Sequence, residues 1–156
     1  KKIILIILFP LNYLFAIEAT CNFEEVYQNG EIQQGVFLIK NQMFRYQYYA
    51  QDLFTIISKK NNYYLVKNNT KTVQKINKNT DTIQALVEII SDFPNLKDSY
   101  KYNNSIIKSE HSANKFIKRV SIKSEKLNLS INVLNCNFDK IEKKYFKHFD
   151  FEEYRG

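Results

Sequence analysis

The stretch from Gly35 to Tyr49, GVFLIKNQMFRYQYY, constrains the fold of this 156-residue chain more than any other. Its first half, Gly35–Lys40, is apolar almost throughout, and its second half alternates between two sets of side chains. One set is Phe44, Tyr46 and Tyr48, and the other is Arg45, Gln47 and Tyr49. Successive side chains of a strand point to opposite faces of a sheet, so this alternation predicts a half-buried strand. We therefore expect two short strands joined at Lys40–Met43, in an antiparallel meander with an aromatic and aliphatic concave face.

Similar apolar or alternating runs predict further strands on both sides of this stretch. The expected strands lie at Leu53–Ser58, Tyr63–Lys67, Thr72–Ile76, Ile106–Glu110, residues 116–122 and residues 127–133, after an opening strand that turns at Asn29–Gly30. The aromatic tail, Lys143–Gly156, is expected to add a last strand that closes one edge of the sheet. No repeat, linker or domain boundary interrupts the chain, so one domain is predicted.

One segment changes from the strand period to the helix period. Ile83, Leu86, Val87 and Ile90 recur at the spacing of one helical face, and Phe93–Pro94 ends the pattern. The helix, over residues 82–92, is the only one expected after the leader. It either packs as ordinary core or forms a lid over the concave face of the sheet.

The first 19 residues resemble a cleavable export signal. Lys1 and Lys2 form a charged start, an apolar segment follows, and Ala16 and Ala19 offer cleavage sites. The apolar segment is short for a membrane span, and a retained anchor is the alternative. The prediction is a signal peptide at 1–19, a single domain at 20–156, and a mature protein in the periplasm or secreted.

The two cysteines, Cys21 and Cys136, can form one disulfide in an exported protein, and two free buried thiols are the alternative. Together with two distant histidines they make no zinc site, so no metal or cofactor is expected.

The formal charge of +7 leaves several partner classes open. Aromatic rings among lysines can bind single-stranded nucleic acid, but export and the expected packing of the rings argue against a nucleic-acid partner. His148 lies two residues before Asp150, yet a hydrolase triad would also need a nucleophile that the spacing does not supply. The chain is therefore predicted not to be an enzyme, with an envelope hydrolase using His148 and Asp150 as a remaining alternative.

The order of these features is similar to the LolA family, the periplasmic carriers of outer-membrane lipoproteins. The similarity is carried by a leader followed by G-V-F-L-I-K at 35–40, M-F-R-Y-Q-Y at 43–48, L-F-T-I-I-S at 53–58 and N-N-Y-Y-L-V at 61–66. In that family a Gly-started strand ends in Lys-Arg-Pro and is followed by a Phe-Arg-Trp-like strand, a Leu-Ile-Val-Ser strand and a Gly-Lys-x-Leu-Trp-x-Tyr strand. The resemblance covers residues 22–93 and consists of patterns rather than a ligand signature.

The resemblance implies a mainly β (α+β) fold, an unclosed antiparallel β-barrel (half-barrel) with a helical lid over its concave face. An apolar cavity would bind the acyl chains of lipoproteins, without a cofactor, and a monomer would carry them toward the outer membrane. The implied partners are acylated lipoproteins, an inner-membrane releasing complex and an outer-membrane acceptor. The implied cavity residues are Phe37, Ile39, Phe44, Tyr46, Tyr48, Ile56 and Leu65, beneath a lid formed by Ile83, Leu86, Val87 and Ile90.

Two departures from the family pattern concern how a ligand would be handed over. Lys40-Asn41-Gln42 stands where the family has Lys-Arg-Pro, so the arginine thought to latch the lid is missing there. Arg45 occupies the position of the Phe-Arg-Trp arginine and is a candidate contact for the lid or a partner. The family usually begins with a long amphipathic helix before its first strand, whereas here only a few residues separate the predicted leader from Cys21, so we expect either a trimmed homologue or an uncleaved leader in that role. The alternative function is an exported β-sheet interaction or structural module with a packed core and no ligand.

Overall fold

The computed structural model describes residues 18–77, 89, 92–93, 95–102, 104–113, 116–125 and 127–155. Within them lie ten strands: β1 (Glu18–Tyr27), β2 (Ile32–Lys40), β3 (Met43–Tyr48), β4 (Phe54–Lys59), β5 (Asn62–Lys67), β6 (Val73–Ile76), β7 (Ser99–Tyr102), β8 (Ser105–His111), β9 (Ile117–Lys123) and β10 (Asn128–Asn137). One 3-10 helix, η1, spans Lys143–Phe146. The strands form a single antiparallel sheet in the order β6-β5-β4-β3-β2-β1-β10-β9-β8-β7.

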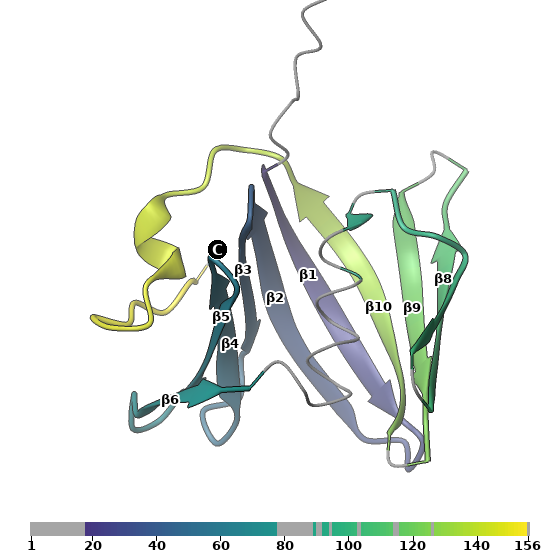
Figure 1. Cartoon of the computed structure of the whole chain (residues 1–156), viewed down its shortest axis with the longest axis horizontal. Coiled ribbons are helices and arrows are strands. Elements are labelled where there is room, and N and C mark those ends of the chain that lie inside the picture. Colours follow the sequence, from purple (N-terminus) through teal and green to yellow (C-terminus); the bar gives the residue numbers. More distant parts are fainter. Residues whose placement is uncertain are drawn as a thin grey trace, which may run out of the picture.

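The sheet curves around one face but does not close. Its two end strands, β6 and β7, do not pair with each other (Figure 1). This confirms a mainly β fold with an open antiparallel sheet. The expected lid residues Ile83, Leu86, Val87 and Ile90 lie outside the described residues. Of the expected helix over residues 82–92, the structure describes only Ile89 and Asp92. Both are helical, but no α-helix is defined among the described residues, so a helical lid is not supported.

The predicted alternation of β3 is confirmed by its pairing and burial. Phe37 pairs with Tyr46 and Ile39 with Phe44 across β2 and β3, and these residues lie on the inner, concave face. Arg45 and the other alternate residues of β3 lie on the outer face, where β2 presents Val36 and Leu38. Residues directly opposite each other in a sheet share a face, so the register of β2 on β3 fixes which side chains point inward.

Most of the core lies on the inner face of the sheet. It is one continuous cluster drawn from both halves of the chain: Ala19, Cys21, Phe23, Phe37, Ile39, Phe44, Tyr46, Tyr48, Ile56, Tyr63, Leu96, Tyr100, Ile107, Ile117, Val120, Ile122, Leu129 and Ile131. A smaller cluster on the outer face joins Val36 and Leu38 to Ile141 and Phe146. The outer face of β2 and β3 is therefore covered by the C-terminal segment, not by solvent.

The prediction of a last strand at Lys143–Gly156 is wrong for the described residues. The segment after β10 forms η1 and then crosses the outer face of the sheet, while β6 and β7 remain the edges (Figure 1). Its aromatic residues find burial on that face, where Phe146 is fully buried. The aromatic composition of the tail reflects this one-sided packing and no strand pairing.

The first strand begins earlier than expected, at Glu18. Ala19 is fully buried opposite Ile39, and Glu18 pairs with Lys40. The last two residues of the predicted leader therefore belong to the sheet. Cleavage after Ala16 would leave β1 intact, whereas cleavage after Ala19 would remove its first two residues. Within the described residues, no helix has the length and hydrophobicity to cross a membrane.

A disulfide joins Cys21 of β1 to Cys136 of β10. The two residues are directly opposite each other in the antiparallel pair formed by these strands. The bridge connects positions 115 residues apart in the sequence and ties β1 to its neighbour β10, the first and the last strand in chain order.

Candidate functional site

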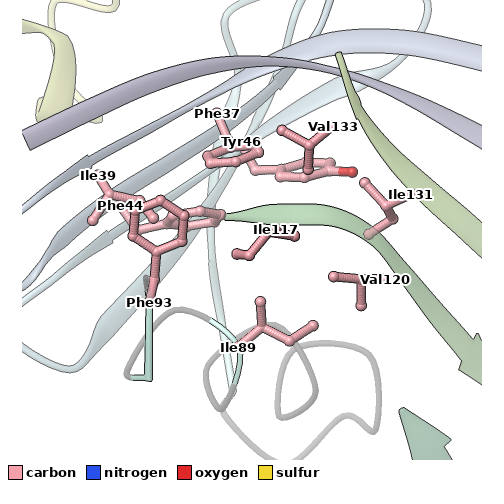
Figure 2. A pocket seen from close by; sticks show the side chains of 10 residues that line it. All are labelled: Phe37, Ile39, Phe44, Tyr46, Ile89, Phe93, Ile117, Val120, Ile131 and Val133. Carbon is pink, nitrogen blue, oxygen red and sulfur yellow. The ribbon is translucent and has the colours of Figure 1, made fainter. Parts of the chain in front are cut away.

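The main candidate site is a hollow on the inner face of the sheet, with a volume of about 440 Å³ including the part open to solvent. The side chains that line it come from four strands and from Ile89 and Phe93, which lie between β6 and β7 in the sequence: Phe37, Ile39, Phe44, Tyr46, Ile89, Phe93, Ile117, Val120, Ile131 and Val133 (Figure 2). We call it the inner hollow. No polar atom of these residues faces it, so its wall consists of hydrocarbon.

Strand register brings the two halves of the chain to this hollow. On one side β2 and β3 supply the pairs Phe37–Tyr46 and Ile39–Phe44. On the other side β9 and β10 supply the pair Val120–Ile131. Between these halves, β1 carries the small residues Ala19 and Cys21 on its inner face. Because short side chains in the middle of a curved sheet leave space that larger ones would fill, these two residues help to leave the hollow open.

Ile89 and Phe93 face the sheet from across the hollow (Figure 2). The ring of Phe93 meets Phe37 edge-on, with 6.2 Å between ring centroids, and meets Phe116 in the same way at 6.2 Å. Edge-to-face contacts of this kind fix the orientation of aromatic rings. Phe93 therefore connects the strand that carries Phe37 to the start of β9.

Beside the hollow, the buried carboxylate of Glu25 accepts hydrogen bonds from three tyrosines. The hydroxyl groups of Tyr27, Tyr46 and Tyr48 donate to it at 2.7, 2.5 and 2.8 Å. Tyr46 belongs to both environments, because its ring lines the hollow while its hydroxyl group is bound to Glu25. The network satisfies the polar atoms of this region and keeps them away from the apolar wall.

Burial and the nearby carboxylate raise the pKa of all three tyrosines. Burial is the larger cause, and it raises the pKa of Tyr27 to about 12. The pKa of Tyr46 and that of Tyr48 are raised well above the usual value of 10.0 for the same reason. The three hydroxyl groups are therefore neutral donors at physiological pH, and Tyr46 adds no charge to the wall of the hollow.

The residues predicted to line a cavity fall into two groups. Phe37, Ile39, Phe44 and Tyr46 line the inner hollow. Tyr48 and Ile56 are buried in the same inner cluster without lining the hollow, and Leu65 is half-buried opposite Ile56, on the same face of the sheet.

Arg45 lies on the opposite face of the sheet from the hollow and is fully buried there. Its guanidinium donates to the carbonyl oxygens of Tyr145, at 2.8 Å, and Glu152, at 2.7 Å, and stacks over the ring of Phe151. Burial lowers the pKa of Arg45 to about 10. Its described contacts are therefore with the C-terminal segment of its own chain, and the contact with a lid or partner stays a prediction.

Sequence reasoning missed the side chains that complete the hollow from the far half of the sheet. Ile117, Val120, Ile131 and Val133 lie in two runs whose alternation predicts strands. Alternation puts Ile131 and Val133 on one face, whereas Ile117 and Val120, three positions apart, line the same hollow because the pairing of β9 shifts register at Lys118. Neither pattern says that these side chains lie across from Phe37 and Phe44. That information comes from the pairing of β1 with β10, which no local pattern encodes.

The other candidate residues have different surroundings. His148 stacks on Tyr64 on the outer face, with 3.7 Å between ring centroids, and Asp150 is exposed. Among the described residues, no three His, Cys, Asp or Glu side chains gather in a way that could hold a metal ion.

Comparison with known proteins bears on the fold alone. No protein-family model and no curated protein sequence matches the chain. Among solved structures, a LolA superfamily protein from Nitrosomonas europaea is similar, with a TM-score of 0.55 at 9% sequence identity. The match covers 85% of this chain and 90% of that one. The open antiparallel sheet that surrounds the inner hollow is therefore a fold that this chain shares with a LolA superfamily protein.

Proposed function

We propose that this protein binds acyl chains in its inner hollow and carries acylated lipoproteins or related lipids through the periplasm toward the outer membrane. The observation that carries the proposal is a hydrocarbon-walled hollow on the inner face of an open sheet. Acyl chains gain roughly 0.8 kcal/mol for each methylene group that leaves water, and a wall without polar atoms imposes no desolvation cost in return.

Three further observations support the proposal. The fold is shared with a LolA superfamily protein. The Cys21–Cys136 disulfide fits an oxidising compartment such as the periplasm. The leader-like segment before β1 fits export to that compartment.

The proposal is tested by titrating the purified chain with a dansyl-labelled undecanoic acid and following dansyl emission. Saturable binding, displaced by unlabelled palmitic acid, is expected. Mass spectrometry of the same preparation should detect co-purified acyl species. A folded protein that neither carries acyl species nor binds the probe would contradict the carrier function and favour the packed interaction module.

A filling variant locates the binding. Val120→Phe places a larger apolar side chain at the wall of the hollow, so it should abolish probe binding with little loss of stability. The control is Val36→Phe on the outer face, where the site is fully buried in a packed cluster. There the same enlargement should cost about 1–3 kcal/mol of unfolding free energy. Equal destabilisation by both variants would indicate that the inner face is packed solid.

A further inference from the structure

A second apolar groove lies where β9 and β10 separate. Their pairing ends at Arg119–Asn132, although β9 continues to Ile117 and β10 to Asn137. A groove of about 640 Å³, including space open to solvent, follows these unpaired strand ends. It is lined by Ser112, Phe116, Ile117, Lys118, Val133, Leu134, Asn135, Cys136 and Phe138, and we call it the outer groove.

Among the described residues, both irregularities in strand pairing occur at this groove. In the pair of β8 with β9, Glu110 lies opposite Arg119 and His111 opposite Ile117, so Lys118 is an extra residue. In the pair of β1 with β10, Leu134 is the extra residue between Val133 and Asn135. β-Bulges redirect side chains and are frequent beside functional sites. Here they place a cationic and an apolar side chain at the same groove.

The outer groove adjoins the inner hollow. Ile117 and Val133 line both. A row of aromatic rings follows the same path, because Phe93 of the hollow meets Phe116 edge-on at 6.2 Å and Phe116 meets Phe138 at 5.6 Å. Phe138 and Leu134 end this apolar path at the surface, where they are 57% and 58% exposed.

We infer that the outer groove is the portal for the acyl chain and holds its oxygen-bearing end. This inference rests on the proposed function. The inner hollow offers no polar atom to a carboxyl, ester or amide group, and burying such a group without a partner is costly. The outer groove instead combines apolar rings with Ser112, Lys118 and Asn135, which can donate hydrogen bonds to acyl oxygens. The chain therefore enters between β9 and β10, with its methyl end inside and its polar end beside Lys118.

Two phenylalanines of equal exposure provide a matched test. Phe138, at the outer groove, and Phe149, in the C-terminal segment, are both 57% exposed. In the dansyl-undecanoic acid titration, Phe138→Ser should weaken binding about fivefold by removing apolar contact, whereas Phe149→Ser should leave it unchanged. Thermal melting of both variants checks that each is folded.

The outcomes separate the two proposals. If the wild-type protein binds the probe and both variants bind equally well, the portal is wrong and the carrier function stands. If the folded wild-type protein binds no probe, the proposed function fails and the portal fails with it.

A second measurement reports the orientation of the chain. The sequence contains no tryptophan, so Phe138→Trp and Phe149→Trp each introduce a single indole fluorophore. Palmitic acid brominated next to its carboxyl group should quench the Phe138→Trp protein more strongly than palmitic acid brominated at its methyl end. Neither should quench the Phe149→Trp protein appreciably. Stronger quenching by the methyl-end bromine at position 138 would overturn the proposed orientation.

Discussion

The ring of Phe23 lies directly over Gly35, its partner across the β1–β2 pair. A Cβ atom added at Gly35 would collide with this ring and with the backbone oxygen of Gln47. The ring of Phe23 in turn stacks on Tyr46 at 4.1 Å between centroids. Gly35, the first residue of the Gly35–Tyr49 stretch, therefore leaves the space that the Phe23 ring of the neighbouring strand occupies.

We expect Gly35→Ala to lower the unfolding free energy by about 1–3 kcal/mol, because the added methyl group forces the Phe23 ring and the β3 backbone to shift. Urea denaturation followed by circular dichroism measures the loss. Gly30→Asn is the control. Gly30 has a positive φ of 84°, so asparagine there carries backbone strain, but nothing lies within 4 Å of its added Cβ and the variant makes no steric clash. An equal loss in both variants would contradict a steric role for Gly35.

Loss of the Cys21–Cys136 disulfide should lower stability by about 2–4 kcal/mol, because the bridge restricts a very long loop in the unfolded chain. The test compares thermal melting of the wild-type protein with and without dithiothreitol. The Cys21→Ala/Cys136→Ala double variant should melt at the temperature of the reduced protein and should not respond to the reductant. A wild-type melting temperature that dithiothreitol leaves unchanged would show that the bridge contributes no stability.

Arg45→Met should release the C-terminal segment from the outer face. The substitution removes the donors to the carbonyl groups of Tyr145 and Glu152 and should cost about 2–4 kcal/mol. Hydrogen exchange should rise in residues 142–155, and a glutamate-specific protease should cleave there sooner. Arg119→Met is the control, since Arg119 is exposed and is expected to contribute about 0.5 kcal/mol or less. Unchanged exchange in the Arg45 variant would refute the role of this side chain as an anchor.

The ion pair of Glu18 with Lys40 should make the stability of β1 depend on pH. The hydrogen bond from Lys40, at 2.7 Å, is the main cause that lowers the pKa of Glu18 below its usual value of 4.5. A carboxylate whose pKa is lower in the folded than in the unfolded protein stabilises the fold fully above its unfolded-state pKa. This stabilisation is lost as the pH falls through its folded-state pKa. In a chain that includes Glu18, the stability difference between wild type and Glu18→Gln should therefore shrink below pH 4.5.

A double-mutant cycle provides the control for this pair. In the Lys40→Met background, Glu18→Gln should change stability much less at neutral pH, since the carboxylate has lost its partner. Part of the effect should remain, because the backbone N–H of Ile141 also donates to Glu18, at 2.7 Å. A difference between wild type and Glu18→Gln that stays constant from neutral to acidic pH would rule out the ion pair as its source.

The sequence by itself determined the local elements and their faces. The alternation of Phe44, Tyr46 and Tyr48 with Arg45 and Gln47 identifies β3 and separates its two sides, because the period of a strand is a property of its backbone. The same reasoning placed most of the other strands, although it missed β7, and it identified four residues that line the inner hollow. Leu65 and Tyr48 show its limit, since sharing the inner face does not by itself bring a side chain to the hollow.

Only the tertiary structure decided which strands meet across the sheet. The pairing of β1 with β10 sets Cys21 opposite Cys136 and brings Val120 and Ile131 around the hollow that Phe37 and Phe44 begin. The aromatic tail likewise has a strand-like composition, yet it packs on the outer face because Arg45 and Gln47 there bind its backbone. Contacts between distant segments depend on the register of the whole sheet, and a local pattern carries no information about that register.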